Sequence, residues 1–179
     1  TAGIDLSIGS LLALAGLVSA AVEKGATGLL TGGAAGESGG YGLPAAISAA
    51  VAVGLLGGLL QGIAVSKLKV PPFIGTLGMF GVARGVAFLL AGGTTVPVKN
   101  EFFAALGNGK LYGVPYIIMV TAVFVVIMHY LLSQTKFGQH NYAIGANAQA
   151  ARRAGIDIKW HLLRLYILSG MCAGLAGVL

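Results

Sequence analysis

The chain has 179 residues, of which 56% are hydrophobic and only 9% are charged, and its formal net charge is +6. Soluble domains carry about 25% charged residues, so this composition excludes a chain that folds with water as its main solvent. The positive charge does not indicate nucleic acid, because the basic residues lie in short loops between apolar segments. The pattern indicates a protein that is embedded in a lipid bilayer.

Five segments are apolar enough to be candidate membrane spans, since a helix needs roughly 20 apolar residues to cross the hydrocarbon core. In chain order they are Ile4–Val22, Leu43–Val65, Phe73–Ala91, Val114–Leu132 and Leu162–Leu179. The sequence therefore predicts an all-α polytopic transmembrane helix bundle. Its two ends look cut, which predicts a fragment of a longer membrane protein.

Glycines recur four residues apart inside three of these segments. The sets are Gly54, Gly58 and Gly62, then Gly81 and Gly85, then Gly170 and Gly174. Residues four apart share one helical face, and small residues let helix backbones approach closely in a bilayer. We interpret the three sets as packing surfaces between helices rather than as ligand sites.

The first and third predicted spans carry polar residues. The first opens with GIDLSIGS, which contains Asp5 and Ser7, and the third opens with PPFIGTLGMFG, which contains Thr76 and leads to Arg84. Glycine and hydroxyl groups allow a helix to begin or break at membrane depth where it is buried in protein. We interpret these four residues as intramembrane polar groups or as parts of a translocation path.

Arg84 needs a compensating environment, because a charge near the centre of a span costs at least ~2.5–3.5 kcal/mol on insertion scales. Asp5 is the only acid within a predicted span, so the expected partner of Arg84 is Asp5, in a buried ion pair. Two alternatives stay open. Arg84 could act directly in a substrate path, or its side chain could extend to the membrane surface.

The loops between the spans differ in charge. With alternate crossing, loops 66–72 and 133–161 share one side and, with the start of the fifth span, hold seven cations. These are Lys67, Lys69, Lys136, Arg152, Arg153, Lys159 and Arg164. Loops 23–42 and 92–113 hold three lysines against three glutamates. The positive-inside rule therefore predicts that loop 133–161 is cytoplasmic.

Loop 133–161 also predicts a short helix. Residues Ala146–Arg153 are helix formers, Asn147 is a plausible N-cap, and Gly155 is a natural C-terminal stop. One interpretation is a docking element for a soluble partner, and the other is an interfacial anchor with Arg152 and Arg153 on anionic headgroups. The alanine-rich face favours docking, because lipid-binding helices prefer Leu, Phe and Trp. Trp160 and Tyr166 are expected to anchor the fifth span at the membrane interface.

The sequence offers no signal for catalysis or for a cofactor. Its three histidines, His129, His140 and His161, are too scattered for a metal site, and the phosphate-binding pattern GxxxxGK[ST] does not occur. We expect no catalytic, metal-binding or cofactor-binding residue, and we interpret the protein as a membrane subunit rather than an enzyme.

Three motifs in register carry a family resemblance: GIDLSIGSLLAL, KVPPFIGTLGMFGVARGVAFLLAGG and TKFGQHNYAIGANAQAARRAGI followed by YILSGMCAGLAGVL. Over essentially its whole length the chain resembles the membrane permease subunit of bacterial ABC importers for monosaccharides, of the ribose, xylose, galactose and arabinose type. The resemblance implies a single permease domain of about ten transmembrane helices, of which residues 1–179 form a part. The implied location is the bacterial inner membrane.

The resemblance also implies partners and site residues. The permease would work as a pair beside two separate ATPase subunits, which bind the ATP, and a periplasmic binding protein would deliver the sugar. The cytoplasmic coupling segment that docks in the ATPase would comprise Asn147, Ala148, Ala150, Ala151, Arg152, Arg153, Gly155 and Ile156. The intramembrane family motifs match Gly3–Ser7 and, farther along, Thr76–Gly78 with Arg84 and Gly85.

Three alternatives stay open. The chain could belong to a secondary transporter or channel that needs no ATPase, or to a membrane scaffold without transport activity. Within the ABC class, it could belong to the related permeases that import branched-chain amino acids.

Overall fold

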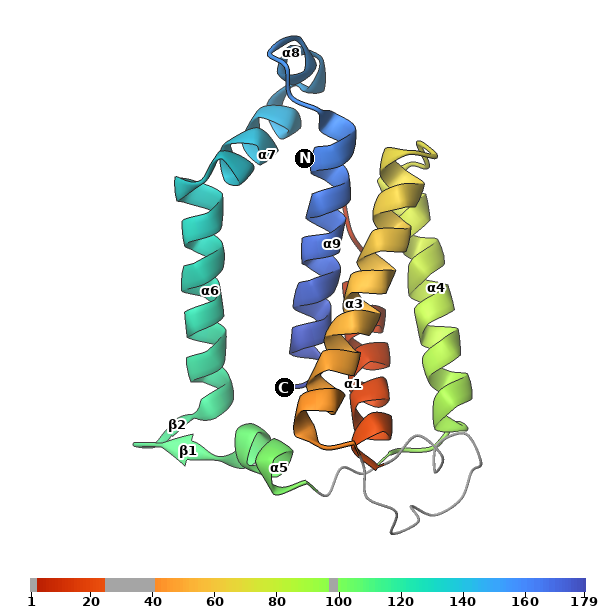
Figure 1. Ribbon diagram of the computed structural model, residues 1–179, viewed down its shortest axis with the longest axis vertical. Helices are drawn as coiled ribbons and strands as arrows, with labels where there is room; N and C mark the ends of the chain where they lie inside the picture. Colours follow the sequence, from red (N-terminus) through yellow and green to blue (C-terminus); the bar gives the residue numbers. More distant parts are fainter. Residues whose placement is uncertain (1–2, 25–40, 97–99) are drawn as a thin grey trace.

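Long helices dominate the computed structural model, which describes residues 3–24, 41–96 and 100–179 (Figure 1). Within these residues the long helices are α1 (Ile8–Lys24), α3 (Leu43–Ser66), α4 (Pro72–Ala91), α6 (Tyr116–Gln134) and α9 (Ile158–Ala176). One of them falls in each segment that the hydropathy pattern selects. The predicted all-α polytopic class is confirmed.

Three of these helices, α3, α4 and α6, are long and apolar enough to cross a membrane by length and composition. Helix α1 has 17 residues, which is short for a full span. Helix α9 has 19 residues but carries Lys159 and Arg164 in its first two turns. Three of the five predicted segments therefore qualify as candidate spans.

The first helix starts later than predicted, because residues 3–7 are not helical. The carboxylate of Asp5 accepts a hydrogen bond from the backbone N–H of Ser7 at 2.9 Å. Such a local bond competes with helical hydrogen bonding and favours a turn before the helix. The prediction that the helix begins at Ile4 is wrong by four residues, and the cause is Asp5 itself.

Helices α3 and α9 lie side by side and pack backbone against backbone (Figure 1). A Cβ atom on Gly54 would collide with the carbonyl oxygen of Gly170, and one on Gly58 would collide with the carbonyl oxygen of Tyr166. A Cβ on Gly174 would lie 2.7 Å from the carbonyl oxygen of Ala50. Only glycine allows this approach, so the predicted packing role of these glycines is confirmed.

The glycines of α4 behave differently. Within the described part of the chain, a Cβ atom on Gly81 or Gly85 would meet no atom within 4 Å. The prediction that these two glycines pack against a neighbouring helix is therefore wrong for the helices described here. Helix α4 instead contacts α1 and α3, and its buried residues are Thr76 and Ala83.

Short elements occupy the segments that the sequence analysis treats as loops. Segment 92–113 contains α5 (Glu101–Asn108), and a small hairpin follows, in which β1 (Lys110–Leu111) pairs antiparallel with β2 (Val114–Pro115). Segment 133–161 contains α7 (Lys136–Ala146) and α8 (Ala148–Arg153). Side-chain caps explain two of the unpredicted helices: Asn100 accepts a hydrogen bond from the N–H of Phe102, and Thr135 accepts one from that of Gly138.

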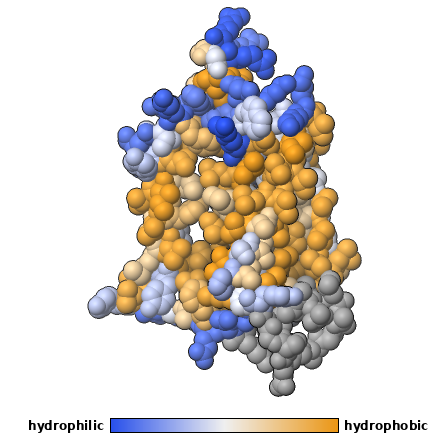
Figure 2. Space-filling view, viewed as in Figure 1, coloured by the Kyte–Doolittle hydropathy of each residue, from blue (hydrophilic) through white to orange (hydrophobic). Residues whose placement is uncertain are grey.

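Helix α6 stands apart from the other long helices and is joined to α9 through α7 and α8 (Figure 1). It has no buried residue, and its packing partners are α5, β2 and α7. Figure 2 shows apolar side chains in a broad band across the visible face, with hydrophilic side chains gathered at the two ends. Helix α8 projects beyond this band, at the end of the molecule where α9 begins.

Candidate functional site

Helix α8 is a short helix whose two ends are both fixed by hydrogen bonds. At its start, the side-chain oxygen of Asn147 accepts hydrogen bonds from the N–H groups of Gln149 and Ala150, both at 3.0 Å. At its end, Gly155 has φ +87°, and its N–H donates to the carbonyl of Arg152. The N–H of Ile156 donates to the carbonyl of Ala151. These two bonds form a Schellman motif.

The predicted N-cap and the predicted stop of this helix are therefore confirmed. The predicted start is two residues too early, because Ala146 belongs to α7 and Asn147 separates the two helices. Asn147 is extended, with φ −158° and ψ 101°, as an N-cap residue requires. The break at Asn147 sets α8 at a new angle to α7.

Most of the predicted coupling residues lie on the surface. Those exposed are Asn147, Ala148, Ala150, Arg152, Arg153 and Gly155. Ile156 is half-buried, and Ala151 is only 4% exposed. The side chain of Ala151 therefore packs within the chain, and its role in the coupling segment stays a prediction. The exposed face combines small side chains with two guanidinium groups, which is suitable for entering a cleft that carries negative charge.

Helix α7 precedes α8 in the chain and also packs against α9. The ring of His161 on α9 lies 4.8 Å from the ring of Phe137 and 5.9 Å from that of His140, measured between centroids. Both partners belong to α7. The sequence analysis set these histidines aside as scattered, and the structure brings two of them together. No signal in the sequence could show this, since the two histidines lie on different helices.

Burial and two basic neighbours act on His161, which precedes the predicted span Leu162–Leu179. Desolvation by burial lowers its pKa below the ordinary value, and the neighbouring His140 and Arg164 lower it further. The neutral imidazole is therefore favoured in the folded protein.

A second group of polar residues surrounds Asp5, at the non-helical start of the chain. One carboxylate oxygen of Asp5 accepts a hydrogen bond from the Ser7 hydroxyl at 2.8 Å and one from the Gln61 amide at 3.1 Å. The other accepts from the Ser169 hydroxyl at 3.0 Å. Ser7 is 0% exposed and Gln61 is 2% exposed. This network ties segment 3–7 to α3 and α9.

Gln61 and Ser169 are functional candidates that the sequence analysis missed. A carboxamide within an otherwise apolar run is itself a signal, because a polar side chain at membrane depth needs a partner in the protein. Gln61 stands in such a run, LLQGIAV. Ser169 carries no comparable signal, since a serine can satisfy its hydroxyl on the helix backbone.

Thr76 joins α4 to the same region. Its hydroxyl lies 3.1 Å from the carbonyl oxygen of Phe73 and 3.4 Å from that of Ile4, and the residue is fully buried. The structure therefore brings together three of the four predicted intramembrane polar residues, Asp5, Ser7 and Thr76.

Arg84 lies elsewhere, and the predicted Asp5–Arg84 ion pair is wrong. The Arg84 side chain is exposed on α4, and its guanidinium carbon lies 5.8 Å from the centre of the Phe80 ring. Hydroxyl and amide groups already supply donors to both oxygens of Asp5. Asp5 is therefore satisfied without a cation.

Comparisons with known proteins agree with this architecture. The family described as "Branched-chain amino acid transport system / permease component" matches residues 1–179. The chain is 32% identical to the galactofuranose transporter permease of Escherichia coli over 179 residues, which cover 100% of the chain and 48% of that protein. No solved structure matches.

Two further Escherichia coli relatives point the same way. The ribose import permease is 33% identical over 183 aligned residues, which cover 100% of the chain and 53% of that protein. The L-arabinose transport system permease is 34% identical over 175 residues, which cover 98% of the chain and 49% of that protein. The chain thus spans about half the length of the curated relatives it matches. The family match over all 179 residues confirms the resemblance noted from the three motifs, and the chain belongs to this family of transport-system permease components.

Proposed function

We propose that the chain is part of the transmembrane subunit of an ATP-driven importer that moves a monosaccharide across the bacterial inner membrane. The permeases to which it is similar carry galactofuranose, ribose and L-arabinose in their names. A neutral sugar rich in hydroxyl groups needs hydrogen-bonding groups along its path more than charges. The apolar helices α3, α4 and α6 agree with this need, since they carry Arg84 as their single Lys, Arg, Asp or Glu residue.

The observation that carries the proposal is α8. It projects beyond the apolar band, it is fixed at both ends, and its exposed side chains are small or basic. We assign segment 133–161 to the cytoplasm and residues 1–179 to a single permease domain. A separate ATPase subunit would bind and hydrolyse ATP, and the exposed residues of α8 would dock in its cleft. Closure of the ATPase pair would then displace α8 and, through α7, the start of α9.

The remaining partners follow from the same proposal. A periplasmic binding protein would deliver the sugar to the opposite end of the molecule, and a second permease subunit would complete the path. We assign Asp5, Ser7 and Thr76 to a network that fixes the non-helical segment 3–7. Arg84 is the member of the predicted set whose exposed side chain is suited to the translocation path.

A second candidate is import of branched-chain amino acids, which the description of the matching family favours. The permeases named above favour the sugar instead. The test is uptake by the complete permease in proteoliposomes with its ATPase and binding protein, using labelled ribose, arabinose and leucine. ATP-dependent uptake of a monosaccharide supports the proposal. Uptake of leucine alone would establish the second candidate, and ion-driven uptake without ATP would establish a secondary transporter.

A further inference from the structure

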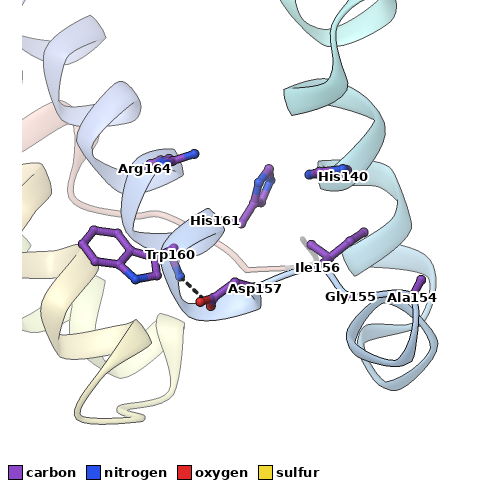
Figure 3. Close-up of a pocket in the computed structure, with 8 residues that line it drawn as sticks. All are labelled: His140, Ala154, Gly155, Ile156, Asp157, Trp160, His161 and Arg164. Carbon is purple, nitrogen blue, oxygen red and sulfur yellow. Dashed lines mark hydrogen bonds between the residues drawn. The ribbon is translucent and has the colours of Figure 1, made fainter.

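A cavity of about 470 Å³ lies between α7, the turn that follows α8, and the first two turns of α9. Figure 3 shows the side chains that line it. His140 extends from α7, and His161 and Arg164 extend from α9, into the space between the two helices. The turn 154–157 contributes the rest of the lining, together with Trp160. Three nitrogen-bearing side chains from two helices therefore face one space.

One of these groups has an unmet hydrogen bond. His161 is 6% exposed, and its Nε2 atom is buried without a hydrogen-bond partner. A buried polar atom without a partner destabilises the folded protein, so it calls for an explanation, and a ligand that binds there supplies one. The ring packs on Phe137, and His161 itself lines the cavity, so a partner bound in the cavity would lie beside this ring.

The charged groups that line the cavity favour an anion as its ligand. Arg164 is always cationic, and the imidazoles of His140 and His161 can each donate a hydrogen bond. Asp157 is the single acid of the lining, and one of its oxygens already accepts hydrogen bonds from the N–H groups of Lys159 and Trp160 at 3.0 and 3.2 Å. A metal ion does not fit, because no group of three His, Cys, Asp or Glu residues in the described chain could hold one.

We propose that this cavity binds a phosphate group, held by the Arg164 guanidinium and by the imidazoles of His161 and His140. A phosphate presents several acceptor oxygens in a tetrahedral array, which suits a guanidinium fork together with separate N–H donors. The group can come from free phosphate or from a phospholipid headgroup. The exposed Trp160 beside the cavity suits the headgroup, since tryptophan concentrates at the membrane interface.

The test uses the complete permease without its ATPase, purified in an alkyl maltoside detergent that contains no phosphorus. Histidine labelled with ¹⁵N in the ring reports on His140 and His161 by NMR, and native mass spectrometry reports on bound lipid. One sample is titrated with inorganic phosphate and the other with phosphatidylglycerol. We expect saturable shifts of both histidine signals with one of these probes, and the probe that acts identifies the source.

Variants distinguish specific binding in this cavity from attraction of the ligand to the positive charge of the whole surface. Arg164→Gln should weaken binding roughly tenfold or more, the effect of losing a charged hydrogen-bonding partner. Lys159→Gln removes the same charge from an exposed residue of the same helix that does not line the cavity, and it should leave the affinity within about twofold. His161→Phe keeps an aromatic ring against Phe137 and should also weaken binding.

Two results would overturn the proposal. One is the absence of a saturable response to either probe. The other is an equal loss of affinity in Arg164→Gln and Lys159→Gln, which would mean that the ligand responds to the charge of the whole surface. Because the ATPase is not present, neither result depends on how α8 couples to it or on which solute is transported.

Discussion

The carbonyl oxygen of Gly170 lies where a side chain on Gly54 would begin, and the carbonyl oxygen of Gly54 lies where one on Gly170 would begin. The two residues face each other across the contact between α3 and α9. Each glycine excludes a side chain at the position of the other. A side chain added to either helix at this level would therefore push the other helix away.

Gly54→Ala should therefore destabilise the complete permease. The added methyl group forces α3 and α9 apart, and overpacking of this kind costs roughly 1–3 kcal/mol. The measurement is the thermal midpoint of unfolding in detergent. The matched control is Gly81→Ala on α4, where a Cβ would meet no described atom within 4 Å. Alanine is also the better helix former by about 1 kcal/mol, so the control should keep or raise the midpoint. An equal loss in both variants would contradict the close packing of α3 and α9.

Loss of the Asp5 hydrogen bonds should lower the stability of the protein more than loss of the Arg84 charge. Asp5→Ala leaves the buried Gln61 amide and the Ser169 hydroxyl without their acceptor, at a cost of about 1.5–3 kcal/mol. Arg84→Gln should change stability little, since Arg84 is exposed on α4. In a double-mutant cycle followed by thermal unfolding, the two losses should add. A coupling energy above about 1 kcal/mol would mean that the two residues interact after all, as the sequence suggested.

Neighbouring alanines of α8 should respond differently to a negative charge. Ala150 is exposed, so Ala150→Glu should leave the thermal midpoint unchanged but prevent the ATPase from copurifying with the permease. Ala151 is 4% exposed, so Ala151→Glu should lower the midpoint, because a buried unpaired charge is costly. The control Gln139→Glu places the same charge on an exposed position of α7. If Ala150→Glu retains the ATPase and wild-type uptake, α8 is better interpreted as a lipid anchor.

Stability should fall as the pH drops, and His161 should be responsible for part of the loss. Its pKa is lowered in the folded protein by burial and by His140 and Arg164, so the unfolded chain binds a proton more readily. The stabilising contribution is therefore complete above about pH 6.5, the ordinary pKa of histidine. It is lost as the pH falls from there toward the folded-state pKa.

The measurement is the thermal midpoint at pH 7.5 and pH 5, without phosphate or phospholipid, since a bound anion would favour the imidazolium. His161→Phe should show a smaller decrease than the unmodified protein. His129→Phe on α6 is the matched control and should show the full decrease. The same decrease in both variants would exclude His161 as the responsible group.

Much of the fold could be predicted because the responsible interactions are local. The apolar runs fix the long helices, and Asn147 and Gly155 fix both ends of α8 through hydrogen bonds within a few residues of each. The Asp5 network could not be predicted, because it joins Asp5 to Gln61 and Ser169, residues that are 56 and 164 positions away. Charge alone predicted Arg84 as the partner of Asp5. The carboxylate of Asp5 instead accepts hydrogen bonds from neutral side chains. The His140–His161 pair was missed for the same reason, since its partners meet only after α7 turns back toward α9.

The glycine contact also constrains how the molecule can move. The backbones of α3 and α9 touch without side chains between them. No side chain can change its rotamer to accommodate a shift, so a displacement of α9 should displace α3 as well. The two helices are therefore expected to move as one rigid body, with any change between conformations at its contacts with α1, α4 and α7. Spin labels placed on the outer faces of α3 and α9 should keep a constant separation through the cycle, while the separation of either helix from α6 changes.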